Sequence, residues 1–349
     1  MEIQTEQIKK DWKNIFSQSL TSKRELDSFF CHTFPETNYP IRLPMRIANK
    51  IKVLGLDSKL AKQYLPHENE KSSLGHKDPI GDQVYKTSNI IHRYQNRALI
   101  LPTTICPTIC RYCFRKNELY EQEFNKKNLA QTDEYLSAHP EIEEIIFSGG
   151  DPFILSENIL FEYLNLLKKH SHIKSLRFHT KTFVTIPERL TAELMSFLEK
   201  CLEFFENVTI VHHLNTADEI DDDVKKVFKR LRKLPLHQFS QSVLLKDIND
   251  TTEELTQLFQ KLSANGVIPY YLHHPDQVKG GLHFYISLEE GRKIYHSLRQ
   301  KLPGWMIPQY ILDLPNGEGK TPVYNPHSFK DKDSFINKDG KLVDVSFEY

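Results

Sequence analysis

From Ala98 onward, short apolar runs alternate with amphipathic stretches, and this alternation constrains the fold more than any other feature of the sequence. Each of six runs has four to eight residues and is rich in β-branched or aromatic side chains, which predicts buried strands. Segments with helical periodicity lie between the runs, and the last of them ends at Asn265-Gly266, which is typical of a helix C-terminus. The runs are Ala98–Ile105, Glu144–Phe147, Ser175–His179, Val208–Leu214, Gln241–Leu245 and Val267–Leu272.

Six strand–helix units in series predict an α/β fold in which a parallel sheet is wound into a full or partial barrel. In such barrels the reactive groups lie at the carboxyl ends of the strands, so the residues that follow each run are the candidates for chemistry. The clearest helical segments are Ser156–Lys169, Pro187–Lys200, Ile220–Leu234 and Thr252–Ala264.

The charges of the chain balance, with 46 Lys and Arg against 46 Asp and Glu. This balance argues against a protein that coats nucleic acid or lies on a membrane surface. No apolar run approaches the roughly 18 residues that span a bilayer, and Met1–Lys10 is charged where a signal peptide needs an apolar centre. We therefore expect a cytoplasmic protein that binds neither nucleic acid nor membrane.

Three of the five cysteines form the triplet Cys106-x3-Cys110-x2-Cys113, directly after the first predicted strand. Three thiolates on one tight loop can hold three irons of a 4Fe-4S cluster and leave the fourth iron free to bind a small molecule. A structural zinc site needs a fourth ligand at short spacing, and none follows. The triplet therefore favours a catalytic iron–sulfur cluster.

In this position the cysteine triplet resembles the radical S-adenosylmethionine (SAM) superfamily. The resemblance implies a partial (β/α)6 TIM-like barrel in which SAM binds the open iron and an electron from the cluster releases a 5′-deoxyadenosyl radical. A second mark of that superfamily is a glycine-rich turn after the second strand that approaches the SAM amino group through bare backbone. Ser148, Gly149, Gly150 and Asp151 occupy that place here.

Further strings narrow the resemblance to the lysine 2,3-aminomutase family, over about residues 40–323. By length the chain is most similar to the short branch, the elongation factor P modification enzyme B type. The strings are His92-Arg93-Tyr94, Cys110–Arg115, Phe147–Pro152, Gln241–Leu245 with Asn249-Asp250, Pro269–Leu272, and Asp313 followed by Gly317–Pro322.

Lys320 lies in Asn316-Gly-Glu-Gly-Lys-Thr321, which superficially resembles a phosphate-binding loop. It fails that pattern because Leu314 stands where the first glycine is required. In the aminomutase family the matching lysine forms the Schiff base with pyridoxal 5′-phosphate (PLP), and glycine-flanked backbone lets it swing. Arg93 and Arg97 match the region that binds the PLP phosphate.

The resemblance also implies substrate and SAM contacts. Arg115 matches the arginine that pairs with the substrate carboxylate, and Asp276 and Asp313 match the two aspartates that hold the lysine side-chain ammonium. The short branch usually lacks the second aspartate, so Asp313 strengthens the lysine prediction and departs from that branch. His213 and Gln241, which follow or end two predicted strands, match positions that touch SAM.

The expected organisation has three parts: an N-terminal helical extension (1–89), a radical SAM core barrel (90–300) and a C-terminal segment that carries the PLP lysine (301–349). Within the first part, prolines near Phe34 and Tyr39 divide a helical pattern into short helices.

The resemblance predicts an isomerase, a PLP- and SAM-dependent lysine 2,3-aminomutase that makes β-lysine for attachment to elongation factor P by a partner lysyl ligase. A flavodoxin or ferredoxin would supply the electron. Two alternatives stay open: an aminomutase for free lysine or another amino acid such as arginine, and a non-catalytic iron–sulfur scaffold. A scaffold has no reason to keep both the cysteine triplet and Lys320.

Overall fold

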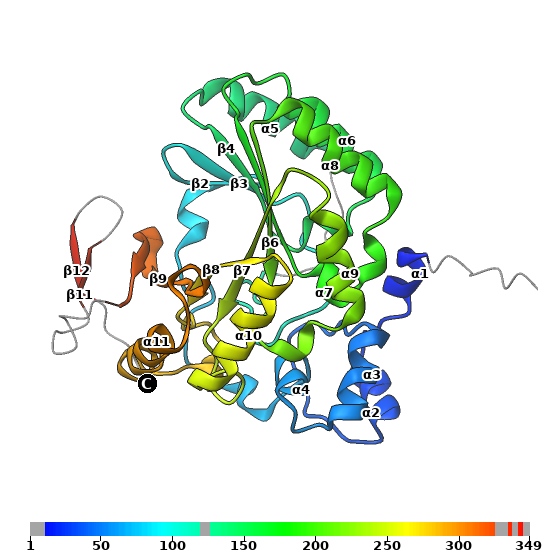
Figure 1. The fold of residues 1–349 in the computed structure, drawn as a ribbon, viewed down its shortest axis with the longest axis vertical. Coiled ribbons are helices and arrows are strands. Elements are labelled where there is room, and N and C mark those ends of the chain that lie inside the picture. Colours follow the sequence, from blue (N-terminus) through cyan, green and yellow to red (C-terminus); the bar gives the residue numbers. More distant parts are fainter. Residues whose placement is uncertain (1–10, 119–125, 325–333, 337–340, 345–349) are drawn as a thin grey trace, which may run out of the picture.

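The computed structural model of the chain describes residues 11–118, 126–324, 334–336 and 341–344. The charged start at Met1–Lys10 therefore lies outside the described residues. Ten strands form one sheet in chain order, and the sheet curls into a partial barrel (Figure 1). None of the described helices is both long and apolar enough to cross a membrane.

Seven consecutive strands of this sheet are parallel, from β3 to β9, with antiparallel pairings at both edges. The predicted parallel α/β fold is therefore confirmed. The strands are β1 (Lys86–Thr87), β2 (Ile90–Tyr94), β3 (Arg97–Ile100), β4 (Glu144–Phe147), β5 (Ser175–Thr180), β6 (Asn207–His213), β7 (His237–Val243), β8 (Ile268–His273), β9 (Gln309–Leu314) and β10 (Gly319–Pro322). A separate pair is formed by β11 (Ser334–Ile336) and β12 (Leu342–Asp344).

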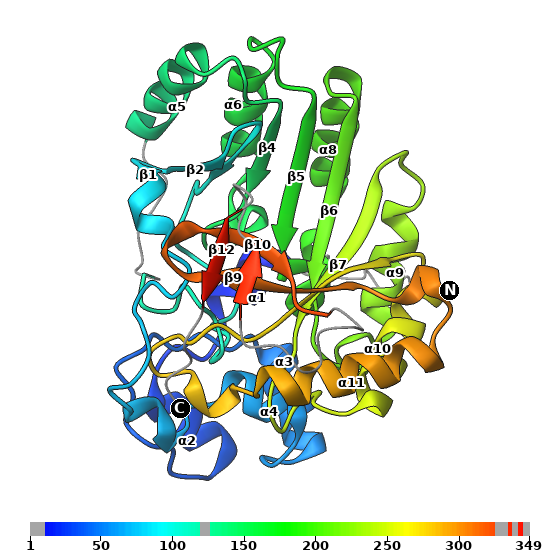
Figure 2. The same ribbon diagram turned by 90° about the vertical axis from the view of Figure 1, so that its left-hand side faces the viewer.

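One helix or more connects each pair of neighbouring parallel strands, and these helices cover the convex face of the sheet (Figures 1 and 2). The covering helices are α5 (Lys126–Ala138), α6 (Glu157–Leu167), α8 (Ala192–Phe204), α9 (Asp222–Leu231), α10 (Thr252–Ala264) and α11 (Leu288–Lys301), with a short α7 (Thr182–Thr185) after β5.

Along each strand, successive side chains point in turn toward the covering helices and toward the concave side of the sheet. In β5, Leu176 and Phe178 are buried in the main core, whereas Arg177 and His179 line a cavity on the concave side. This follows from the two-residue period of a strand. Each buried side chain of this size stabilises the fold by roughly 1.5–3 kcal/mol, so the apolar half of the strand anchors the polar half.

Four short helices precede the sheet, and the second, third and fourth of them share a core of their own. They lie beneath the carboxyl ends of the parallel strands (Figure 2). Ser22 and Glu25 cap the second helix reciprocally, which stabilises a short helix whose first amides have no internal partner. The helices are α1 (Trp12–Ser17), α2 (Lys23–Phe30), α3 (Met45–Leu54) and α4 (Lys59–Tyr64).

Several predicted bounds were wrong. The first strand ends at Ile100 instead of Ile105, because the chain turns away at Pro102 toward the cysteines. The fifth predicted strand is β7, which begins at His237, four residues earlier than predicted; its polar residues are buried by tertiary contacts that the sequence does not reveal. The predicted helix at Pro187–Lys200 begins only at Ala192, after Thr191 caps it.

The sequence analysis missed β9 and β10, which continue the sheet across residue 301. The division at 1–89, 90–300 and 301–349 stays a prediction.

Candidate active site

The three cysteines lie in the connection between β3 and α5. Burial raises the pKa of Cys113 to about 12 and that of Cys106 well above its usual range, so a thiolate here needs a bound cation. Among the described residues, the three sulfur atoms do not all lie within 4.8 Å of one another. Thiolates around a single Zn²⁺ lie about 4 Å apart, so the arrangement fits a multi-iron cluster better than one zinc ion.

The cysteine loop is held by the N-terminal part of the chain. Arg111, between two of the cysteines, is 1% exposed and forms a bidentate ion pair with Glu70. Its remaining donors bond the Pro40 carbonyl at 3.0 Å and the Thr37 hydroxyl at 2.9 Å. The backbone amide of Ile109 also donates to the Arg42 carbonyl at 3.0 Å. Residues 37–70 therefore fix the shape of the cysteine loop.

The glycine-rich turn after β4 packs against the segment that leads to Cys106. A Cβ at Gly150 would lie 2.1 Å from the Ile105 carbonyl oxygen, and Gly149 has φ +101°, which other residues rarely adopt. The bare backbone of Gly150 thus faces the chain's own backbone. Ser148 lines the concave cavity.

Asp151, at the end of this turn, is buried, and its carboxylate accepts hydrogen bonds from the chain itself. The donors are the amides of Phe153, Lys181 and Thr182 and the hydroxyl of Thr180. Asp151 therefore joins the turn after β4 to the turn after β5.

A cavity of about 500 Å³ occupies the concave face of the sheet, and a smaller one of about 150 Å³ lies beside Cys110 and Cys113. The larger one falls within the usual size of ligand sites. The two cavities share His213, Gln241 and Asp276, so predicted cofactor and substrate residues separate them.

Lys320 and Asp313 face each other across the hairpin of β9 and β10, where they are register partners. The ammonium of Lys320 forms an ion pair with the Asp313 carboxylate. The backbone amide of Lys320 donates to the Tyr94 hydroxyl at 2.8 Å, which joins the last strand of the sheet to β2. Lys320 is therefore in a strand and not in the loop that the sequence suggested. Its side chain is 30% exposed.

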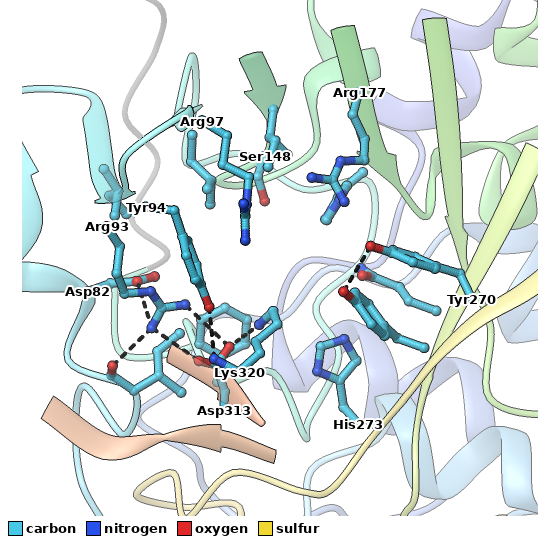
Figure 3. A pocket seen from close by; sticks show the side chains of 18 of the residues that line it. Asp82, Arg93, Tyr94, Arg97, Ser148, Arg177, Tyr270, His273, Asp313 and Lys320 are labelled. Carbon is cyan, nitrogen blue, oxygen red and sulfur yellow. Dashed lines mark hydrogen bonds and ion pairs between the residues drawn. The ribbon is translucent and has the colours of Figure 1, made fainter. Parts of the chain in front are cut away.

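A chain of buried charges continues from Asp313. One Nη of Arg93 lies 3.1 Å from Asp313 and 3.7 Å from Asp82. Asp82 also pairs with Arg115 at 2.5 Å. These four side chains thus form a series of alternating charges at the cavity wall, and Figure 3 shows Asp313, Arg93 and Asp82.

Other donors at the cavity make no hydrogen bond to the described residues. They are Nε and Nη1 of Arg115 and Nε of Arg177, all of them buried. Nη1 of Arg115 lies 4.0 Å from the Glu118 carboxylate. Another nitrogen of Arg177, Nη2, donates to Oε2 of Glu144 at 2.7 Å. The Arg97 guanidinium stacks 3.8 Å from the centre of the Tyr94 ring. Arg97 and Arg177 point into the cavity from the side opposite Lys320 (Figure 3).

The two candidate substrate aspartates differ electrostatically. Burial, and then the charge of Asp313, raise the pKa of Asp276 to about 8. Burial also acts on Asp313, but the charges of Lys320 and Arg93 outweigh it and hold the Asp313 pKa below its usual value. Asp313 is therefore ionised at neutral pH, whereas Asp276 is mostly protonated.

A further buried ion pair lies near Cys110. Lys181 Nζ is 2.6 Å from Glu219 and 3.4 Å from the Tyr112 hydroxyl, which in turn is 2.8 Å from His213 Nε2. Glu219 also accepts a hydrogen bond from Tyr64 of α4 at 3.1 Å. These contacts connect the N-terminal helices to the predicted SAM region.

The sequence analysis missed several side chains of the site, among them Asp82, Tyr94, Arg177 and Tyr270. The candidates taken from the sequence were residues at the carboxyl ends of strands, whereas the cavity is also lined by residues along the concave face of the sheet. The alternation of apolar and polar residues in Ser175–Thr180 was the available signal for Arg177. Asp82 had no local signal.

The chain is similar to known proteins over most of its length. The model of the radical SAM superfamily matches residues 100–269. The L-lysine 2,3-aminomutase of Escherichia coli (strain K12) is 35% identical over 289 residues, which are 82% of this chain and 83% of that protein. The L-lysine 2,3-aminomutase of Buchnera aphidicola subsp. Baizongia pistaciae is 32% identical over 327 residues, 89% of this chain and 95% of that protein. A glutamate 2,3-aminomutase of Clostridioides difficile (strain 630) is 31% identical over 283 residues, 80% of this chain and 64% of that protein.

Proposed function

Because this chain belongs to the lysine 2,3-aminomutase family of the radical SAM superfamily, we propose that it uses PLP at Lys320 to convert L-lysine into β-lysine. Membership of the family makes it a radical SAM enzyme and an isomerase. The single observation that carries the finer proposal is the meeting of Lys320, Asp313 and Arg115 at one cavity, next to the cavity of the cysteines.

PLP fits the larger cavity because an amine and two guanidinium groups face each other across it. Lys320 is the amine that would bind the cofactor. Arg177, whose Nε has no partner among the described residues, suits a phosphate together with Arg97. Arg93 is engaged by Asp82 and Asp313, so the proposal gives it the task of holding Asp313 and gives the phosphate to Arg97 and Arg177.

Cys106, Cys110 and Cys113 would hold three irons of the cluster, and the fourth iron would bind SAM in the smaller cavity. His213 and Gln241 lie between the two cavities, which supports SAM contacts there. When bound, the two cofactors supply hydrogen-atom abstraction from an unactivated carbon and a π system that carries the migrating nitrogen. The protein's own part is to hold the substrate between them and to keep water out.

Arg115 would hold the substrate carboxylate through Nε and Nη1, which make no hydrogen bond to the described residues, while Asp82 holds Nη2. Asp313 and Asp276 would hold the side-chain ammonium. With Lys320 bound to PLP, Arg93 would be the remaining cation beside Asp313, and the Asp313 carboxylate could accept the substrate ammonium. A second carboxylate, as in glutamate, would be repelled by the ionised Asp313, so lysine is the better substrate for this site.

The proposed destination of the β-lysine is elongation factor P, through a partner ligase, with a flavodoxin or ferredoxin as electron donor in the cytoplasm. This part rests on the resemblance to the short branch of the family. Its test is the intact mass of elongation factor P from cells with and without this gene. An unchanged mass would leave free β-lysine as the product.

The decisive experiment is an anaerobic incubation of cluster-loaded protein with SAM, PLP, a strong reductant and lysine, followed by mass spectrometry. We expect β-lysine and turnover that depends on PLP. Deoxyadenosine without β-lysine would overturn the assignment of Asp276 and Asp313, and parallel incubations with arginine and glutamate would then identify the substrate.

Three variants separate the roles. Cys110→Ala should abolish deoxyadenosine formation, whereas Lys320→Ala should remove the PLP absorbance and keep the cluster. Lys233→Ala, at an exposed position, is the control and should behave like the parent chain. Full activity of Lys320→Ala would refute the PLP assignment.

A further inference from the structure

Two histidines and a carboxylate converge outside the catalytic cavity. His92 belongs to β2, and His139 and Glu141 lie in the connection between α5 and β4. One ring nitrogen of each histidine and one carboxylate oxygen of Glu141 all lie within 4.8 Å of one another. We propose that His92, His139 and Glu141 form a second metal site that takes a divalent ion, with Zn²⁺ as the best match to imidazole and carboxylate ligands.

Both rings are held in a way that leaves one nitrogen lone pair for a metal. His92 Nε2 lies 3.1 Å from the Gln95 carbonyl oxygen, which can only accept a hydrogen bond, so this nitrogen carries the proton. The lone pair is then on Nδ1, where the Tyr135 hydroxyl is its partner at 3.1 Å. A metal would take the place of that hydroxyl proton.

His139 offers Nδ1 as its ligand atom. This Nδ1 lies 2.9 Å from Glu141 Oε1, so a metal ion between the two atoms would take the place of the proton that they share, and Nε2 would carry the proton of the ring. Metal-binding histidines usually donate their second N–H to a carbonyl or a carboxylate, as His92 does to Gln95, because the bond fixes the ring and its tautomer. The Tyr135 ring stacks on His139 with centroids 4.2 Å apart, so packing also holds the ligand.

The site has a mechanical consequence for the catalytic cavity. Between Ile91 and Tyr94 the pairing of β2 with β3 is irregular, and His92 and Arg93 are the two residues in this irregular part. A metal on His92 would fasten it to the segment before β4 and so fix the position of Arg93, which holds Asp313. The proposed site would thus connect β2, near the edge of the sheet, to the ion pair of Arg93 and Asp313 in the cavity.

The test is calorimetric titration of Zn²⁺ into the cluster-loaded protein, in which the three cysteines are already occupied. We expect one Zn²⁺ per chain, a rise in the unfolding temperature with Zn²⁺, and X-ray absorption with nitrogen and oxygen ligands only. Removal of one ligand in His139→Ala or Glu141→Gln should weaken binding on the order of 10²-fold. Glu143→Gln, at an exposed carboxylate two residues away, is the matched control and should bind like the parent chain.

Two results would overturn the proposal. One is the lack of Zn²⁺ binding to the parent chain at 100-fold excess over protein. The other is equal affinity in His139→Ala and the parent chain, provided that both unfold at the same temperature without zinc. Sulfur ligands in the absorption spectrum would assign any bound zinc to the cysteines instead.

Discussion

Arg111 and Arg115 lie four residues apart on the cysteine loop and are 1% and 5% exposed, yet their surroundings differ. Arg111 faces the N-terminal helices, where each of its three nitrogens has a partner within the chain. Arg115 faces the catalytic cavity, where one nitrogen pairs with Asp82 and the other two donate to no described residue.

This difference distinguishes the residues that stabilise the structure of the site from those that are available to bind a ligand. A buried donor without a partner costs about 1–3 kcal/mol, so a fold keeps such donors only where something else stabilises them. On the cluster side the chain satisfies its own polar groups and gains rigidity. On the cavity side the unpaired donors of Arg115 and Arg177 are available to an anionic ligand.

The largest expected effect is on the stability of the protein and concerns Arg111, on the side of the cysteine loop that faces the N-terminal part of the chain. Arg111→Met leaves the Glu70 carboxylate buried without its partner, and breaking a buried ion pair in this way costs about 3–5 kcal/mol. We expect that loss in the free energy of unfolding, measured by denaturant titration, together with a lower iron content. Arg24→Met, at an exposed position, should change stability by less than about 0.5 kcal/mol. Equal stability of the two variants would show that the Arg111–Glu70 ion pair does not stabilise the cysteine loop.

Arg115→Met should show the opposite pattern, with loss of activity and little loss of fold. Removing one partner of a buried charge pair with the substrate costs about 2–5 kcal/mol, or roughly 30- to 5,000-fold in kcat/KM. Because Asp82 keeps Arg93 nearby, the fold should survive. Steady-state kinetics and iron content distinguish the two effects, and Arg115→Lys should recover part of the activity. Loss of the iron–sulfur cluster in Arg115→Met would show that Arg115, like Arg111, stabilises the cysteine loop.

Gly150→Ala tests the contact between the glycine-rich turn and the cysteine loop. A Cβ there would meet the Ile105 carbonyl at 2.1 Å, and overpacking of this kind costs up to about 3 kcal/mol. We expect reduced stability and weaker cluster retention. In Gly304→Ala the new Cβ meets nothing within 4 Å, so this variant is the control. If both variants retain iron equally, the turn does not shape the loop.

The smallest effect concerns pH. Since the Asp276 pKa is about 8, the fraction of ionised carboxylate rises about tenfold between pH 7 and pH 9. The side-chain ammonium of lysine stays protonated over this range, so KM for lysine should fall about tenfold as pH rises. Asp276→Asn should remove this dependence. A KM profile that is the same in both proteins would show that Asp276 does not hold the ammonium.

The local patterns of the sequence predicted much of this arrangement. The cysteine triplet was identified from its spacing, which is that of a set of cluster ligands, whereas the glycine-rich turn and Lys320 were assigned through the resemblance to the family. The strands β4, β5, β6 and β8 were predicted closely, since their apolar residues are contiguous or alternate. By contrast, β9 was missed although it carries Asp313, and the register of the β9–β10 hairpin sets that residue opposite Lys320.

The sequence by itself determined the order of strands and helices, the metal-binding character of the cysteine loop and the family, because these depend on residues that are neighbours along the chain. Only the tertiary structure decided which charges meet. Glu70 reaches Arg111 across 41 residues, and Arg93 reaches Asp313 across 220. Such pairs are selected by packing and burial, since opposite charges are common along the chain and only a low-dielectric contact makes one pairing decisive.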